Sequence, residues 1–312
     1  MAKLVASEAA QDVAVSAMRV LGEAGVTHAH TAERHYRDTP LMIIGEGTNE
    51  IQRTLIARQL VDRYGERPDA LVARDGEPAE RRLMVLAVRQ FVEKRVIPTV
   101  GEHERAGRGP DDLVGDLADL GVLGAVVGAE QGGLGLDVTA TAMIVEELAR
   151  GWTAMAGAVA RHLTVAFAIA WLAARSTREA LLPPMTRGEH VGTAVFGSGV
   201  RARGDGAEWV LGGRTRLADN ASRASLFLVA ATSDEAGDCV ALVERGMPGV
   251  HVGPVTSTLG QRGLDARSLT LDGARMRRDA VFADPHRRVF AFACILSVVG
   301  DEYFAIRDFA EE

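Results

Sequence analysis

The chain has 312 residues, of which 47% are hydrophobic and 25% are charged, and its formal net charge is −7. This length is enough for more than one globular domain, and the composition is that of an ordinary folded protein. The acidic balance argues against a nucleic-acid partner, because phosphate binding requires a basic patch and no long run of Lys and Arg occurs. Two cysteines cannot form a disulfide framework, so we expect a reduced, cytoplasmic protein.

Residues 1–66 are expected to form helices. Apolar residues recur there at helical spacing, at Val13, Ala17, Val20 and Leu21. Gly22 follows where a helix would stop. Beyond a polar loop, Thr48 or Asn49 can cap a second helix with Glu50 in its first turn. The apolar stripe of that second helix would consist of Ile51, Leu55, Ile56 and Leu60.

Residues 67–77 mix Gly, Pro and charge without a sustained period, which indicates a linker. A helical region is then expected over residues 78–190. The apolar face of its first helix would be formed by Leu83, Leu86, Ala87 and Phe91, and Pro98 would end that helix. Pro110 and Asp111 can open another helix that Gly121 closes, and Asp137 can cap a third.

Residues 191–285 have a different pattern, with short apolar runs separated by Gly and Asp. The runs Glu208–Leu211, Ser225–Thr232 and Cys239–Glu244 are typical of strands. Helix is expected again over 286–312, so the chain as a whole is predicted to be α+β. The longest apolar stretches, Leu163–Ala174 and Val289–Gly300, are shorter than the roughly 18 residues that cross a bilayer, so no membrane partner is expected.

The segment ERHYRDTPLMIIGEGTNEIQRTLIARQLV, residues 33–61, resembles the last part of acyl-CoA dehydrogenases, where an Ile-x-Glu-Gly-Thr-x-x-Ile-Gln turn leads to the final helix. LADLGVLGAVVGAEQGGLGLD and LLPPMTRGEHVG resemble the family's N-terminal helical domain, and LGQRGLDARSLTLDG resembles its β domain. The sequence RRVFAFACILSVVGDEYFAIRDFAEE resembles the first helix of its C-terminal bundle. The resemblance implies a helical domain, a β-barrel or sandwich domain and helices of that bundle.

The resemblance also implies FAD-dependent α,β-desaturation of an acyl thioester, carried on coenzyme A or on an acyl carrier protein, with an electron-transfer protein reoxidising the flavin. Such chemistry needs a base for the weakly acidic α proton. Glu46 lies between Gly45 and Gly47 and matches the family's catalytic glutamate, although the pattern by itself is typical of a solvated turn acid. Gly47 would then lie beside the substrate, and the cofactor-contacting positions would be Thr48, Asn49, Glu50, Gly22 and Gly25.

The segments stand in an abnormal order, because the piece at 1–66 comes last in the family. One family helix, which would join the two ends, is missing. The chain can be a circular permutant. Alternatively, residues 1–66 finish the fold of a related chain in a hetero-oligomer, and we favour this second arrangement. Either arrangement leaves an apolar surface to be covered.

The β domain departs from the family at its flavin-contacting positions. Leu217, Ala218 and Asp219 replace a Trp-Ile-Thr segment, and an aspartate beside a flavin that becomes anionic on reduction is unfavourable. Only Gly197-Ser198 remains of a longer flavin stretch, and Glu23 follows Gly22 where pyrophosphate is expected. These departures predict weak or absent flavin binding by this domain. They leave two alternatives open, a catalytically decayed structural subunit and a flavin monooxygenase or oxidase of the same fold.

Three further positions have structural interpretations. The eight histidines show no metal-ligand spacing, and His162, on an apolar helix face, is expected to be a hydrogen-bonded core residue. Gly132-Gly133 is expected to form a structural turn. Arg262 is either an ion-pair partner or an interface residue.

Overall fold

The structure is a computed structural model that describes residues 2–28, 30–64, 78–196, 199–258, 260–283 and 288–299. The chain divides into two compact units, residues 1–77 (unit 1) and 78–312 (unit 2), and each is described by itself. The predicted linker at 67–77, the pair Gly197-Ser198 and the tail beyond residue 299 lie outside the described residues.

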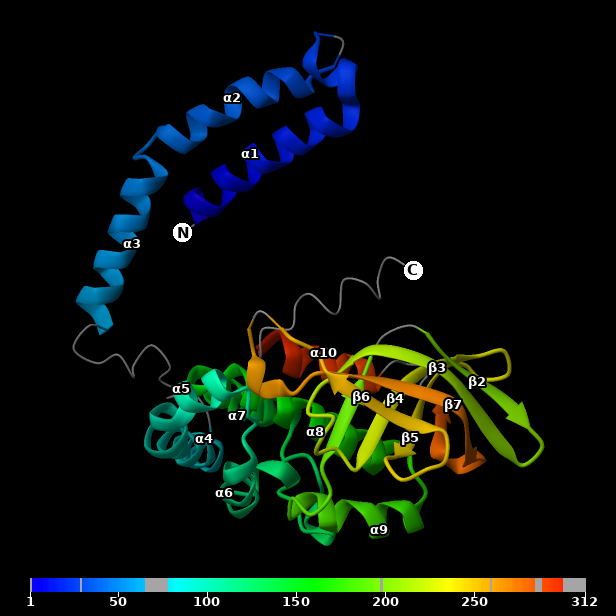
Figure 1. Cartoon of the computed structure of the whole chain (residues 1–312). Coiled ribbons are helices and arrows are strands. Elements are labelled where there is room, and N and C mark those ends of the chain that lie inside the picture. The colour runs from blue at the N-terminus through cyan, green and yellow to red at the C-terminus, as the bar shows by residue number, and fades with distance from the viewer. Residues whose placement is uncertain are drawn as a thin grey trace. The chain divides into compact units, whose positions relative to one another are not determined.

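Unit 1 consists of helices. α1 (Ala2–Leu21) is followed by a short 3₁₀ turn (Gly22–Val26), α2 (Ala32–Ile44) and α3 (Asn49–Tyr64). α1 and α2 lie side by side as an antiparallel hairpin (Figure 1). The end of α1 at Leu21 and the start of α3 at Asn49 confirm the two helices predicted from the spacing of apolar residues.

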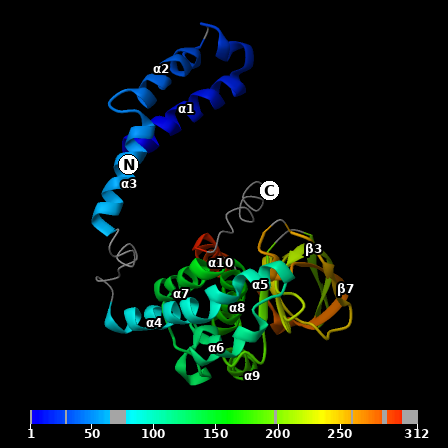
Figure 2. The ribbon, with the colours of Figure 1, turned by 60° about the vertical axis from the view of Figure 1, so that its left-hand side comes forward.

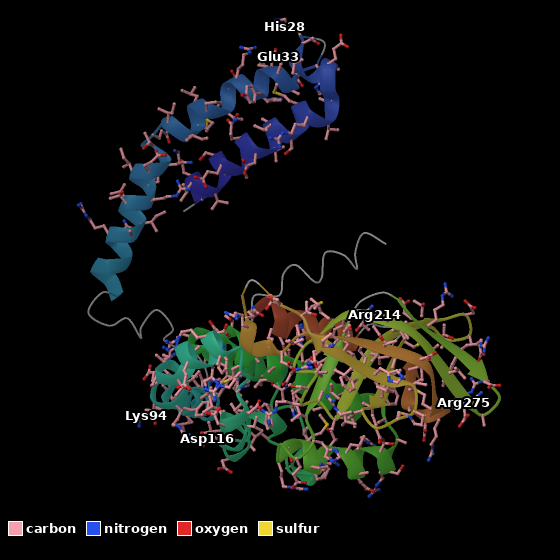
Figure 3. All side chains as sticks on the ribbon, in the orientation of Figure 1. His28, Glu33, Lys94, Asp116, Arg214 and Arg275 are labelled. Carbon is pink, nitrogen blue, oxygen red and sulfur yellow. The ribbon has the colours of Figure 1, made fainter. Side chains whose placement is uncertain are left out.

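The prediction of a polar loop before Thr48 is wrong, because α2 occupies most of that segment. Pro40 lies inside α2 and removes one helix hydrogen bond. Other contacts support the helix. Glu33 and Arg37 form an ion pair one turn apart at 2.7 Å, and the Thr39 hydroxyl donates to Gln11 of α1 at 2.7 Å. At the α1–α2 connection, His28 Nδ1 lies 3.1 Å from Glu33 Oε1 (Figure 3).

Unit 2 opens with α4 (Ala79–Phe91), which continues through a π-helical turn (Val92–Val96) into α5 (Ile97–Ala106). Pro98 therefore does not end the helical run as predicted. It lies at the start of α5, directly after the π-helical turn. The predicted apolar face of α4 is confirmed at Phe91, which is buried, but is wrong at Leu83, which is 68% exposed. Val85 and Val88 are buried instead.

The remaining helices of this region build a core around α8. They are a 3₁₀ turn (Asp111–Leu113), α6 (Val114–Asp119), two further 3₁₀ turns (Val122–Gly124 and Ala129–Gln131), α7 (Val138–Gly151), α8 (Thr153–Leu172) and α9 (Arg175–Thr186). The predicted cap of α7 is confirmed, since the Asp137 carboxylate accepts from the Ala140 N–H at 2.8 Å. Gly121 ends the preceding turn of helix with a φ of 73°.

α8 is longer than the apolar stretch expected from the sequence. By length and composition it could cross a membrane, having a mean hydropathy of 1.5 over an 18-residue window. In unit 2, 72% of that window is buried, which is typical of a core helix. His162 lies within it as predicted, 2% exposed, with Nε2 donating to Leu123 O at 3.1 Å and Nδ1 accepting from the Gly192 N–H at 3.2 Å.

A mixed sheet follows the helices. Its strands are β1 (Gly192–Val195), β2 (Val200–Asp205), β3 (Glu208–Ala218), β4 (Leu226–Ser233), β5 (Gly237–Glu244), β6 (Val250–Val255), β7 (Arg267–Arg277) and β8 (Val281–Ala283). The order is β6-β7-β3-β2-β4-β5-β8, and β1 pairs in parallel with β4. The three strands predicted from apolar runs are confirmed as parts of β3, β4 and β5.

The sheet curls on one side of the helical region (Figure 2). Its own core includes Trp209, Leu211, Phe227 and Leu269. After β8, α10 (Arg288–Val299) returns to the helices, where Phe292 stacks on Phe167 of α8 at a ring separation of 4.3 Å. Helices and a curled sheet segregated along the chain confirm the predicted α+β class.

Candidate active-site turn

The predicted base Glu46 lies in the turn that joins α2 to α3. α2 ends when the Gly45 N–H donates to Leu41 O at 2.7 Å, and Gly45 then adopts an extended conformation. Glu46 and Gly47 follow in the left-handed region, with φ values of 53° and 83°. The Glu46 side chain is exposed in unit 1.

The two glycines that flank Glu46 are required for different physical reasons. A Cβ on Gly45 would lie 2.9 Å from Leu41 O, which is too close for a side chain. Gly47 needs its positive φ, which glycine adopts without steric cost. Glu46 has no such freedom, and its left-handed backbone is kept only where surrounding contacts determine it. One such contact is the Gln52 amide, which donates to Glu46 O at 3.1 Å.

The start of α3 is capped by Thr48, as one of the two sequence alternatives predicted. The Thr48 Oγ1 accepts from the Ile51 N–H at 3.3 Å. The exposed Glu50 carboxylate lies in the first turn, where its own backbone N–H, and after it the Thr48 hydroxyl, lower the pKa of that carboxyl. Thr48 and Glu50 therefore keep polar groups near the surface around Glu46.

Asn49 has a different environment, because its side chain is 1% exposed. Its Nδ2 donates to Ser7 Oγ at 3.0 Å, and its Oδ1 accepts from Lys3 Nζ at 2.8 Å. Lys3 and Ser7, both from α1, were not identified in the sequence. A cation in the first turn of a helix opposes the helix dipole, so the position of Lys3 was an available signal.

The two glycines predicted to contact the cofactor also differ. Gly22 has a φ of 56°, ends α1 and has open space where a Cβ would be. Gly25 is buried, and a Cβ there would lie 2.9 Å from Met18 O, so it is required by local packing. Asn49 and Gly25 therefore serve the interior of unit 1, whereas Thr48, Glu50 and Gly22 lie nearer its surface, with Gly22 at the opposite end of α1 from the Glu46 turn.

In unit 2, the sequence singled out Asp219 as unfavourable to flavin. Its carboxylate lies 2.5 Å from Arg161 Nη2 of α8, and both side chains are mostly buried. The Asp219 carbonyl accepts from the Thr193 hydroxyl at 2.7 Å. Arg161 neutralises this carboxylate, so Asp219 does not present the uncompensated negative charge that the sequence alone suggested. The carboxylate is instead used to join α8 to the end of β3.

Other residues named from the sequence have structural roles. Gly132 has a φ of 83°, and a Cβ on Gly133 would overlap Val127 O, so the Gly-Gly turn depends on both glycines. The backbone N–H of Arg262 donates to Glu104 Oε2 at 3.0 Å.

Three family models match the chain. The acyl-CoA dehydrogenase C-terminal domain matches residues 1–61, the N-terminal domain residues 78–189 and the middle domain residues 188–274. Together with the α+β fold, these matches define an acyl-thioester dehydrogenase-type architecture. The chain belongs to the acyl-CoA dehydrogenase family, and its C-terminal-type segment precedes the N-terminal-type domain, which confirms the permuted order.

Curated relatives include the human mitochondrial short-chain specific acyl-CoA dehydrogenase, 27% identical over 67% of this chain and 54% of the relative. The (2S)-methylsuccinyl-CoA dehydrogenase of Cereibacter sphaeroides is 28% identical over 76% of this chain and 47% of its own length. The chain thus spans about half the length of these relatives. A glutaryl-CoA dehydrogenase from Mycobacterium smegmatis, solved with FADH2, shares the fold with a TM-score of 0.67 at 24% identity, over 74% of this chain and 64% of that one.

Proposed function

We propose that this chain is a subunit of an FAD-dependent acyl-thioester dehydrogenase in which Glu46 removes the substrate α proton. The observation that carries the proposal is the backbone of the Gly45–Gly47 turn. Glu46 is held there in a left-handed conformation between two glycines at a helix junction, in a chain of the acyl-CoA dehydrogenase family. Strain of this kind persists only where neighbouring contacts over-determine it, and it gathers at functional sites.

The roles of this chain's own residues follow from the turn. The exposed Glu46 carboxylate accepts the α proton of the acyl thioester, which is carried on coenzyme A or on an acyl carrier protein. The absence of a side chain on Gly47 lets the thioester approach the backbone. Thr48 and Glu50, beside Glu46, and Gly22, at the opposite end of α1 from the turn, are the positions proposed to contact the cofactor. FAD, when bound, takes the hydride from the β carbon, and an electron-transfer protein reoxidises it.

We further propose that a related chain completes this site. Unit 1 buries few apolar side chains of its own but exposes many large ones, namely Val5, Val13, Val20, Val26, Tyr36, Leu41, Met42, Ile44, Ile51 and Leu55. Val13 and Val20 also line a shallow groove on α1. Large apolar side chains exposed in this number are typical of an interaction site. A hetero-oligomer with a second acyl-CoA dehydrogenase chain would cover it.

The test is Glu46→Gln in the assembled complex, which keeps the size of the side chain and removes the base. We expect dehydrogenase turnover to fall by at least roughly 10²-fold, because general-base catalysis contributes about 10²- to 10⁴-fold. Light scattering should give an unchanged mass for the complex. Full turnover by an intact Glu46→Gln complex would overturn the proposal.

A second candidate is a structural subunit without catalysis of its own, and the replacement of the family's flavin-contacting segment by Leu217, Ala218 and Asp219 favours it. In that case Glu46→Gln changes nothing, whereas deleting residues 1–66 abolishes assembly. The two candidates therefore differ in the result for Glu46→Gln, whereas loss of assembly on deleting residues 1–66 is expected under both.

A further inference from the structure

The ammonium group of Lys3 is the centre of the contacts behind the Glu46 turn. Lys3 Nζ donates to Ile43 O at 3.1 Å, to Gly47 O at 2.9 Å and to Asn49 Oδ1 at 2.8 Å. A lysine ammonium carries three N–H donors, so all three are used. The three acceptors belong to the last turn of α2, to the turn itself and to the first residue of α3.

Each of these acceptors needs a donor. Ile43 O is one of the last carbonyls of α2, which lack partners within the helix and lie at the negative end of its dipole. Gly47 O belongs to a left-handed residue outside any helix. Asn49 is buried and is fixed further by Ser7 of α1. One cation from α1 therefore satisfies both helix ends and the loop between them.

These contacts constrain the backbone of Glu46. Its own carbonyl is held by Gln52 from α3, and the next carbonyl is held by Lys3 from α1. With consecutive carbonyls fixed from two different helices, the Glu46 backbone cannot relax out of the left-handed region without losing one of these bonds. The direction in which the Glu46 side chain leaves the turn is fixed in this way.

We infer that Lys3 is a positioning residue, which acts through the backbone of the Gly45–Thr48 turn to hold the Glu46 carboxylate in its productive place. This inference rests on the proposed role of Glu46. Lys3 itself faces the interior of unit 1 and is not assigned contact with substrate or flavin.

The test uses Lys3→Met in the full chain, since methionine keeps an unbranched apolar stem and removes the charge. Arg53→Gln is the matched control: Arg53 pairs with Glu8, also between α1 and α3, and reaches the turn only through the long 3.4 Å bond from Asn49 Nδ2 to Glu8. Amide hydrogen exchange is measured on peptides covering residues 42–50. Lys3→Met should speed exchange there, whereas Arg53→Gln should leave it at the wild-type rate. Equal exchange in all three proteins would overturn the inference.

Turnover of the assembled complex provides the second measurement. Lys3→Met should lower kcat by roughly ten- to hundred-fold with little change in KM, because a displacement of about 1 Å can cost 10²-fold in rate. A wild-type kcat in Lys3→Met, in a complex that Glu46→Gln inactivates, would refute the role of Lys3 alone. Full activity of Glu46→Gln would instead refute the proposed function, and the exchange result would still decide whether Lys3 holds the turn.

Discussion

Arg161 of α8 and Asp219, the residue after β3, form an ion pair that joins the helices of unit 2 to its sheet. Their charged atoms lie 2.5 Å apart, and the Arg161 Nη1 also donates to Ala194 O of β1 at 3.2 Å. Removing one partner of a mostly buried pair is costly, because the other charge loses its compensation.

Asp219→Asn should therefore destabilise unit 2 by about 1–3 kcal/mol, in the range of hydrogen bonds to charged groups. Asp234→Asn is the control, since Asp234 and Arg201 are both exposed and 3.9 Å apart. All three tryptophans belong to unit 2, so urea unfolding followed by tryptophan fluorescence reports on this unit. Equal midpoints for the two variants would contradict the prediction.

His162 predicts a pH dependence of stability. Burial lowers its pKa from 6.5 to about 4, although the hydrogen bond to Leu123 O acts in the opposite direction. Above pH 6.5 the ring is neutral in both the folded and the unfolded chain. The contribution of the neutral, buried ring to the free energy of unfolding is then fully present. It is lost as the pH falls from 6.5 toward 4, because the unfolded chain then binds a proton that the folded chain excludes.

The full loss of unfolding free energy between pH 6.5 and about pH 4 is on the order of 3 kcal/mol. The difference in unfolding free energy between pH 7 and pH 4.5 should shrink in His162→Gln and stay unchanged in His251→Gln, whose ring is exposed. An identical pH dependence in wild type and His162→Gln would show that this ring does not act as described.

Glu104 is predicted to hold a loop of the sheet region against the helices. Its carboxylate accepts from Trp152 Nε1 at 2.6 Å and from the backbone N–H groups of Arg262 and Gly263 at 3.0 and 3.3 Å. Glu104→Ala leaves these donors without their acceptor and should cost on the order of 3 kcal/mol. Glu102→Ala, which loses only an exposed pair with Arg108, should change stability by less than about 0.5 kcal/mol. Similar unfolding midpoints would rule out this role for Glu104.

Substitution by alanine is expected to have opposite effects on stability at two glycines, Gly133 and Gly115. A Cβ on Gly133 would overlap Val127 O and lie 2.6 Å from Gly124 O, so Gly133→Ala should fold poorly or lower the melting temperature strongly. Gly115 lies in α6 with open space around its Cα. Gly115→Ala should raise stability by about 0.5–1 kcal/mol through helix propensity. Thermal unfolding measures both, and a stabilising Gly133→Ala would be the contradictory outcome.

The sequence predicted the features that depend on local pattern. The cap at Asp137, the stop at Gly22 and the strands within β3, β4 and β5 follow from short-range spacing and turn chemistry. Helix α2 was missed because Pro40 and a polar composition are typical of a loop, whereas an ion pair and a contact to α1 stabilise it. The face of α4 was predicted correctly at Phe91 but not at Leu83 and Leu86, because tertiary packing, not leucine content, decides which side is buried.

For the candidate site, the sequence indicated Glu46 and its flanking glycines through the resemblance to a family motif. Lys3 was not found, because its three acceptors are far along the chain and two of them are backbone carbonyls. Such contacts leave no pattern at fixed spacing. The sequence also did not show that Asn49 and Gly25 are buried inside unit 1. Each depends on tertiary contacts with α1.

We propose that this chain contributes Glu46 to a flavin site that a related chain completes. The most direct measurement is the FAD content per chain, from visible absorbance after FAD is added to the purified full chain and unbound flavin is removed, with the mass determined by light scattering. We expect the chain alone to retain far less than one FAD per chain. Retention of one FAD per chain, by a protein that assembles only with itself, would contradict it.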